Sequence, residues 1–297
     1  MSNTRQITAI TLEQLGKEEK VYTGIPNISV SRMSSLINEF QYDFSYPHIV
    51  KDIAIGICTA GKGVVNINLK KYKISINSLI ILPPNSIVEV LDGLDSLYFE
   101  FSFFNVDFIS HLQLLKDIES MSSLVQDRAC INIAEEDFEF FKSLFRSIAI
   151  QYNNKSLYQK EIIKNLVHVM IYKALELFNA LENQSEEELT NRFNQIFKSF
   201  YFLLLKNFST HRTVNFYANE LHLSPKYFSK SVLLASGKLP SEWIEEMVII
   251  SSKALIRGSK MSISQIADQL NFPNASFFGS YFKKRVGITP LEYRNKE

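Results

Sequence analysis

A two-helix pattern that occurs twice, about fifty residues apart, constrains this chain more than any other feature of its sequence. Tyr217-Ala218 in the first copy corresponds to Ile266-Ala267 in the second, and each alanine is small enough to let two helices cross at close range. Ser224-Pro225 then supplies an N-cap hydroxyl and a proline at the first helical position of the next helix. The pattern predicts two helix-turn-helix units, and its repetition is more specific than either copy alone.

Each copy ends in a helix with one apolar face. Phe228 and Val232 form this face in the first copy, and Phe278 and Phe282 hold the same places in the second. Between the copies, the sequence from Pro240 to about Arg257 predicts a helix of roughly 18 residues, which is about 27 Å long. Since successive major-groove faces on one side of B-DNA lie ~34 Å apart, one chain could insert both recognition helices.

The charge is divided unevenly along the chain. Residues 189–297 hold 15 Lys and Arg against 7 Asp and Glu, a net charge of +8, and residues 1–188 hold 17 against 24, a net charge of −7. The two values add up to the overall net charge of +1. Because lysine and arginine neutralise phosphates when a protein binds nucleic acid, we expect the C-terminal part to face a polyanion.

The region from Ile28 to about Phe104 is rich in β-branched and aromatic residues and is interrupted by turn signals. Residues 53–58 and 64–69 flank Gly61-Lys62-Gly63, which predicts a hairpin, and residues 78–82 and 87–91 predict a second pair of strands around Pro83-Pro84-Asn85. Short strands at nearly regular spacing favour a small antiparallel barrel or sandwich.

Helical periodicity replaces the strand pattern beyond Asn105. Two apolar stripes occur, one from Phe138 to Ile148 and one on a helix expected from Leu157 to Leu181. They could pack against the barrel or against a second copy of the chain. The polar segment from Glu182 to Thr190 is expected to be a linker, and the helix after it opens the second domain.

Four segments of the C-terminal part resemble the signature of the AraC/XylS family in order and spacing. They are Leu223-Ser224-Pro225-Lys226-Tyr227, Gly237-Lys238-Leu239-Pro240, Ile263 to Phe282, and Gly287 to Arg294. The resemblance covers roughly residues 190–297 and implies sequence-specific promoter binding through two tandem units joined by a long helix. Met247, Ser252 and Asn271 depart from the usual arginine, alanine and glycine of the family.

The resemblance also implies the domain organisation. We expect an α+β protein of two domains: an N-terminal cupin-like antiparallel β-barrel with following helices over residues 1–182, and an all-α DNA-binding domain over residues 190–297. Many members of the family use the N-terminal domain to bind an effector or to dimerise. A third reading is that the barrel binds no ligand, because Phe99, Phe101 and Phe103 could fill it entirely.

The candidate DNA-binding residues lie on the two recognition helices. In the first copy Lys226 and Lys230 are the best candidates for base or phosphate contact, Ser229 lies between them, and Tyr227 is placed at the groove rim or in the core. The candidates in the second copy are Asn274, Ser276, Ser280, Lys283, Lys284 and Arg285. The serines can make few bidentate base contacts, so we expect specificity to depend more on the first copy.

Five aromatic residues of this region are expected in the core rather than at bases, namely Trp243, Phe272, Phe278, Phe282 and Tyr293. Arg294 is left open between an acidic partner and a phosphate. For each of these lysines and serines, the competing interpretation is a solvent-exposed side chain that contacts no DNA.

The sequence predicts no enzyme, no cofactor and no metal site. A cupin metal centre needs several converging ligands, and the strand region offers only His48, while Cys58 and Cys130 form no metal-binding pair. A cupin-type metalloenzyme with a nucleic-acid tether is the rival hypothesis.

The expected partners are double-stranded promoter DNA, RNA polymerase, an unidentified small-molecule effector and a second copy through the N-terminal helices. Without a signal peptide or membrane span, the protein is expected in the cytoplasm.

Overall fold

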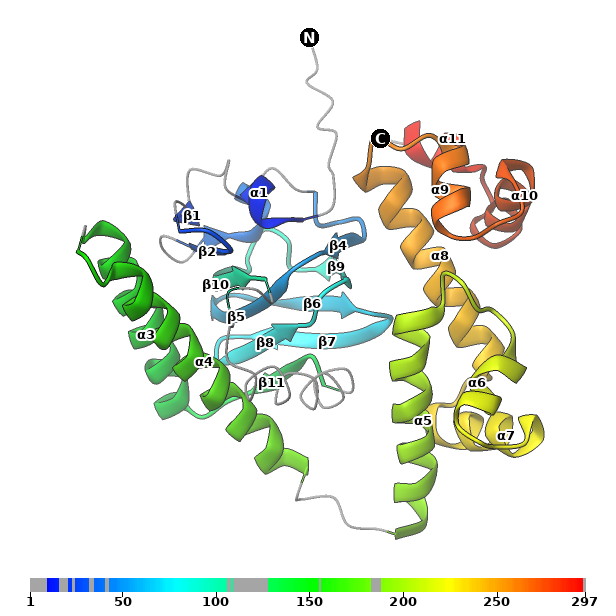
Figure 1. The fold of residues 1–297 in the computed structure, drawn as a ribbon, viewed down its shortest axis with the longest axis horizontal. Coiled ribbons are helices and arrows are strands. Elements are labelled where there is room, and N and C mark those ends of the chain that lie inside the picture. Colours follow the sequence, from blue (N-terminus) through cyan, green and yellow to red (C-terminus); the bar gives the residue numbers. More distant parts are fainter. Residues whose placement is uncertain are drawn as a thin grey trace. The chain divides into compact units, whose positions relative to one another are not determined.

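The computed structural model describes residues 10–15, 21–22, 25–31, 35–40, 43–105, 108, 128–154, 156–182 and 188–295. The described residues form two compact units, one that ends at residue 182 and one that begins at residue 188 (Figure 1). The first unit is built from antiparallel sheets followed by helices, and the second is helical. The predicted fold class is therefore confirmed.

The strands and helices of the N-terminal unit are, in chain order, α1 (Leu12–Leu15), β1 (Val21–Tyr22), β2 (Ile28–Ser31), β3 (Ser35–Leu36), β4 (His48–Val50), β5 (Ile53–Ala60), β6 (Lys62–Ile67), β7 (Lys70–Ser75), β8 (Ser78–Leu82), β9 (Ser86–Asp92), β10 (Tyr98–Phe104), β11 (Cys130–Asn132), α3 (Glu135–Asn153) and α4 (Gln159–Glu182). A 3-10 helix covers Ile37–Glu39.

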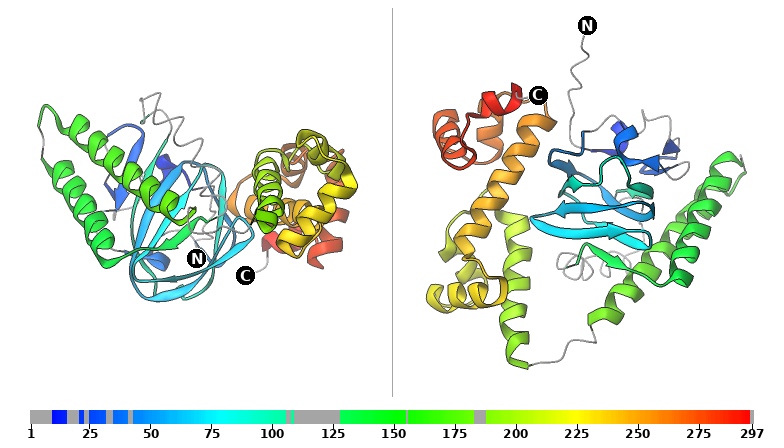
Figure 2. Two further views of the ribbon diagram at one scale, coloured as in Figure 1. Left: turned by 90° about the horizontal axis from the view of Figure 1, so that it is seen from below. Right: turned by 180° about the vertical axis from the view of Figure 1, so that it is seen from behind.

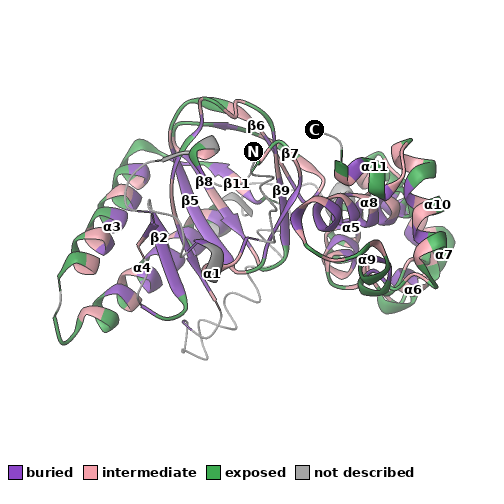
Figure 3. Cartoon of the chain, turned by 90° about the horizontal axis from the view of Figure 1, so that it is seen from above, coloured by how far each residue is buried: buried purple, intermediate pink, exposed green. Residues whose placement is uncertain are grey.

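The strands form two antiparallel sheets. One has the order β1-β2-β10-β5-β8-β11, with β3 also paired to β10, and the other has the order β4-β9-β6-β7. Side chains of both sheets line the space between them, among them Ala54, Leu82, Val65 and Ile67. Most of the strand residues are buried (Figure 3). The arrangement is a cupin-like sandwich, and among the described strands no pairing joins the two sheets into one closed barrel.

The predicted hairpin between residues 53–58 and 64–69 is wrong. β5 pairs with β8 and β10, whereas β6 pairs with β7 and β9 in the other sheet. Gly61, with φ of 86°, carries the chain from one sheet to the other, and a Cβ there would lie 1.8 Å from the carbonyl oxygen of Ser96. The hairpin forms instead at Asn68-Leu69, where both residues have positive φ.

The second predicted pair is also split between the sheets, because β8 pairs with β5 and β11 while β9 pairs with β4 and β6. Alternation of apolar and polar residues shows which side of a strand faces the core. It does not show which strand lies alongside, and this is why both pairings were wrong.

The helices α3 and α4 pack against each other, and α3 also packs on β2 and β10 (Figure 2). The stripe of α3 from Phe138 to Ile148 is buried. Lys173 of α4 forms an ion pair with Asp137 of α3 at 3.0 Å. Packing within the chain therefore accounts for the α3 stripe, and residues 183–187 of the predicted linker lie outside the described residues.

The C-terminal unit contains α5 (Glu188–Asn207), α6 (Val214–Glu220), α7 (Pro225–Ser236), α8 (Pro240–Gly258), α9 (Ile263–Gln269), α10 (Ala275–Val286) and α11 (Pro290–Asn295). The predicted connecting helix is confirmed as α8, which has 19 residues. Helices α5, α6 and α7 gather at the N-terminal end of α8, and α9, α10 and α11 gather at its C-terminal end (Figure 1).

Candidate nucleic-acid interface

The first helix-turn-helix unit consists of α6 and α7. Tyr217 and Ala218 of α6 are fully buried, and Phe228 of α7 is buried against them through Phe200 of α5, whose ring centroid lies 5.2 Å from that of Phe228. The Ser224 hydroxyl accepts a hydrogen bond from the backbone N–H of Tyr227 at 3.3 Å. The predicted cap and inner face are thus confirmed, and they fix where the recognition helix begins.

The second unit, α9 and α10, repeats this construction. Ile266 and Ala267 are buried in α9, and the side chain of Asn274 accepts a hydrogen bond from the backbone N–H of Phe277 at 3.0 Å, which caps α10. Asn271, where the family usually has glycine, has φ of 53°, and His222 at the same place in the first unit has φ of 54°. Asparagine tolerates this left-handed conformation, so the departure leaves the turn intact.

The internal repeat continues beyond the two helices of each helix-turn-helix unit. Gly237 and Gly287 both end their recognition helices in the left-handed conformation. Three residues after Leu239, Glu242 accepts a hydrogen bond from the Leu239 backbone N–H at 2.6 Å, and Glu292 accepts one from Thr289 at 2.7 Å. The start of α8 and the whole of α11 are therefore equivalent helices. The shared Gly-x-x-Pro spacing was the signal that could have revealed this equivalence.

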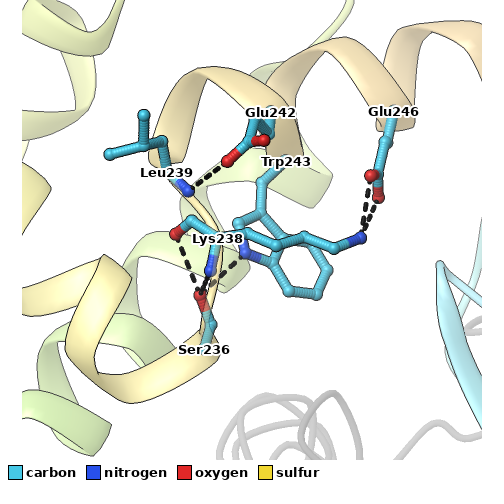
Figure 4. A network of polar contacts seen from close by, with 6 residues as sticks. All are labelled: Ser236, Lys238, Leu239, Glu242, Trp243 and Glu246. Carbon is cyan, nitrogen blue, oxygen red and sulfur yellow. Dashed lines mark hydrogen bonds and ion pairs between the residues drawn. The ribbon is translucent and has the colours of Figure 1, made fainter.

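A polar network fixes α7 to the beginning of α8 (Figure 4). The indole N–H of Trp243 donates to the hydroxyl of Ser236, the last residue of α7, at 2.9 Å. Lys238, in the short turn after Gly237, forms an ion pair with Glu246 at 2.7 Å, and its Nζ lies 5.2 Å from the centre of the Trp243 ring. Because these contacts join two helices, α7 cannot rotate freely about α8.

Arg212 provides a direct connection between the two helix-turn-helix units. It precedes α6, and its guanidinium donates a hydrogen bond to the carbonyl oxygen of Leu270, in the turn of the second unit. The guanidinium also lies over the ring of Phe272, 3.8 Å from its centroid. The Asn271 side chain donates to the Thr210 carbonyl at 3.4 Å. The units are therefore joined by two routes, helix α8 and this contact.

The predicted residues of the first recognition helix lie on one side of α7. Lys226 and Lys230 are exposed, and Ser229 is partly exposed between them. Tyr227 is partly covered, with the guanidinium of Arg192 at 5.9 Å from its ring centroid. The two lysines are one helical turn apart, so their charges face the same way.

In the second recognition helix, Ser276, Ser280, Lys283 and Lys284 are exposed, and Asn274 is exposed while capping the helix. Arg285 is held differently. Its guanidinium forms an ion pair with Glu245 of α8 and lies 4.3 Å from the centre of the Tyr281 ring. The hydrogen bond to Glu245 raises the pKa of Arg285. This residue therefore ties α10 to α8.

The structure also places two residues, Arg294 and Phe277, to which the sequence gave no definite role. Arg294 donates to the carbonyl oxygens of Ile256 at 2.9 Å and Met261 at 2.7 Å, so it holds the junction of α8 and α9. Phe277 of α10 is 64% exposed although it is a large apolar residue. Of the expected core aromatics, Trp243, Phe278, Phe282 and Tyr293 are buried, and Phe272 is half-buried beneath Arg212.

The N-terminal unit contains a cavity of about 110 Å³ between its sheets. The lining residues in the described part of the chain are all apolar and include Ile55, Val65 and Ile67. Phe99, Phe101 and Phe103 also line it, so in this structure they do not fill the sandwich completely.

His48, the one histidine of the strand region, is buried at the edge of the Phe44 ring, with centroids 5.3 Å apart. Burial lowers its pKa to about 4, and a hydrogen bond and charge from Asp43 oppose this shift. Among the described residues, no group of three or more His, Cys, Asp and Glu is placed to hold a metal ion.

Comparisons with known proteins match both units. A family model described as a helix-turn-helix domain matches residues 217–296, and one described as an AraC-like ligand binding domain matches residues 36–137. Regulatory protein PocR of Salmonella typhimurium is 33% identical over 79 residues, which are 27% of this chain and 26% of PocR. The transcriptional activator RhaR of Yersinia pestis is 31% identical over 61 residues, 20% of this chain and 21% of RhaR.

A crystal structure of ToxT from Vibrio cholerae aligns over 84% of this chain and 93% of its own, with 17% identity and a TM-score of 0.41. The chain spans about a quarter or less of the length of the curated relatives named above.

The double helix-turn-helix with its long connecting helix defines a DNA-binding protein. Its N-terminal unit matches an AraC-like ligand binding domain and its C-terminal unit a helix-turn-helix domain, so in both units the chain is similar to AraC/XylS-type transcriptional regulators. No helix in the described residues is long and apolar enough to cross a membrane.

Proposed function

We propose that this protein binds specific promoter sites by inserting α7 and α10 into adjacent major grooves of one duplex. The observation that carries this proposal is that both recognition helices lie on the same side of α8 with their polar faces exposed (Figures 1 and 2). The 19 residues of α8 span about 28 Å. This length suits two helices that enter grooves ~34 Å apart.

The proposed contacts divide into two kinds. Lys226, Ser229 and Lys230 of α7 contact base edges and the adjoining phosphates, with Tyr227 at the groove rim. On α10, Ser276 and Ser280 reach bases or phosphate, while Lys283 and Lys284 neutralise phosphates without reading sequence. Asn274 and Arg285 support α10 from its two ends, the first as its cap and the second through Glu245.

The test begins with duplexes selected from a random pool by the full-length protein. Lys230→Ala is expected to weaken binding to the selected duplex roughly tenfold and to lower the dependence of affinity on salt, because a phosphate or base contact is lost. Lys160→Ala, which removes an exposed positive charge from α4, is the matched control and should bind as the wild type. A pool without sequence enrichment, or equal affinity of the Lys230 variant, would refute the proposal.

The lining of the N-terminal cavity supports an apolar effector. The apolar lining provides no ionic partner, so the proposed effector places a small apolar group there. A cavity of about 110 Å³ is comparable to the ~150 Å³ engineered cavity known to bind benzene. A thermal-shift series with benzene, toluene and indole should raise the melting temperature of the wild type. It should have no effect on Ala54→Leu, whose larger side chain occupies the space, and an equal response of both proteins would contradict the proposal.

The exposed apolar residues of α4 support pairing with a second copy of the chain. We propose that two copies pair through α4, where Ile162, Val169 and Tyr172 are exposed at spacings of seven and three residues with Asn165 between them. Such a seam is typical of helix–helix pairing.

A promoter-bound regulator would work in the cytoplasm beside RNA polymerase, and the proposal includes no catalytic step. We also propose that the regulatory domain extends over residues 1–182 and the DNA-binding domain over residues 190–297.

A further inference from the structure

Phe277 lies at an unusual place for an exposed aromatic residue. It is the third residue of α10, and 64% of it is exposed. The next residue, Phe278, is fully buried and supplies the core contact of this turn of the helix. Phe277 therefore adds nothing comparable to the core. In a recognition helix the N-terminal residues are those that meet base edges, so Phe277 stands where sequence is read.

The residues around Phe277 are small. Ser276 and Ser280 are exposed beside it, and a Cβ built on Gly279 would meet no atom within 4 Å. Small side chains let a helix approach the floor of the groove closely, and the phenyl ring is then the group that projects furthest. The corresponding Tyr227 of α7 is only partly exposed, with Arg192 near its ring. The two recognition helices thus present different chemistry, lysines on α7 and an apolar ring on α10.

The major groove offers one apolar group, the 5-methyl of thymine. A phenyl ring carries no hydrogen-bond donor or charge, so it cannot pair with phosphates or with the polar edges of the bases. Stacking is also unavailable to it because the bases of a duplex already stack on one another. We propose that Phe277 makes the site of α10 specific for thymine through contact between its ring and this methyl group. The inference rests on the proposed insertion of α10 into the major groove.

Deoxyuridine tests the contact because it differs from thymidine only by this methyl group. In the duplex selected by the full-length protein, each thymine is replaced in turn by deoxyuridine. Wild-type affinity is expected to fall about fourfold at one or two positions, the effect of losing one buried methyl group. Phe277→Ala is expected to bind the thymine and deoxyuridine duplexes equally at these positions. Leu291→Ala, which truncates an exposed apolar residue of α11, should keep the wild-type discrimination.

Several results would overturn the inference. They are a selected site that contains no thymine, deoxyuridine substitutions that never weaken wild-type binding, and discrimination that persists in Phe277→Ala. Circular dichroism should show that this variant folds as the wild type, because its side chain is exposed. If duplexes are enriched and Lys230→Ala weakens binding while deoxyuridine has no effect, only the thymine contact fails. If no duplex is enriched, the proposed function fails and the contact with it.

Discussion

Single side chains hold the two helix-turn-helix units in register. Arg212 crosses from the first unit to the carbonyl of Leu270 and the ring of Phe272, and burial lowers its pKa because the charged form is partly desolvated. The hydrogen bond and the ring contact offset this cost. A lysine would satisfy one acceptor but could not lie flat on the phenyl ring, so arginine suits this position in a way that lysine does not.

Arg212→Ala should lower the free energy of unfolding of the C-terminal unit by about 2 kcal/mol, since it removes a charged hydrogen bond and a cation–π contact. Trp243 is the one tryptophan of the chain and lies in this unit, so its fluorescence in urea reports the change. Lys260→Ala, which truncates an exposed cation between α8 and α9, should change stability by less than ~0.5 kcal/mol. Equal stabilities of the two variants would show that the Arg212 contact contributes nothing.

His48 makes the stability of the N-terminal unit depend on pH. Its pKa is about 4 in the folded chain against 6.5 for an ordinary histidine, because burial disfavours the charged form. Its contribution is fully present above pH 6.5 and is lost as the pH falls toward 4, since the unfolded chain then binds a proton that the folded chain does not.

The loss should reach about 3 kcal/mol at full protonation. Urea unfolding followed by far-ultraviolet circular dichroism measures it at neutral and acidic pH. His48→Phe should remove this part of the pH dependence, and contributions common to both proteins cancel in the difference. An unchanged pH dependence in the variant would mean that other groups are responsible.

At the scale of elements, the sequence predicted helices better than strand partners. The cap of α7, the connecting helix and the repeat of α9 and α10 all follow from residues within a few positions of one another. β5 and β6 are adjacent in the chain yet lie in different sheets, because Gly61 redirects the backbone between them. Local patterns determine a helix almost completely, whereas a strand also needs partners chosen by the whole unit.

The exposed face of α4 should be sensitive to charge. If it forms the dimer seam, Val169→Glu buries a carboxylate in the interface and should raise the dimer Kd at least tenfold. Analytical ultracentrifugation over a concentration series gives this constant. Arg146→Glu, at an exposed position of α3, is the control for a change of surface charge. A wild type that stays monomeric at all concentrations, or a Val169 variant that dimerises normally, would exclude this face as the interface.

At the scale of the molecule, the double connection through α8 and Arg212 predicts a fixed distance and rotation between the two half-sites. Inserting five base pairs between them turns one half-site by about half a helical turn and should reduce affinity to that of a single half-site. Inserting ten base pairs should not restore it, because α8 cannot extend by a further ~34 Å.

Electrophoretic mobility shifts with the full-length protein measure these affinities, and insertions outside the site serve as controls. A flexible connection would restore binding with ten base pairs, so that result would contradict the rigid arrangement.

The sequence by itself determined the two helix-turn-helix units, the connecting helix and the lysines of the recognition helices, because caps, helical spacing and charge depend on near neighbours in the chain. Only the tertiary structure decided which strands pair, that Arg212 joins the units, that Arg285 is held by Glu245, and that Phe277 stays exposed while Tyr227 is partly covered. Each of these depends on what lies against a residue from a distant part of the chain, and periodicity along the sequence carries no record of that neighbour.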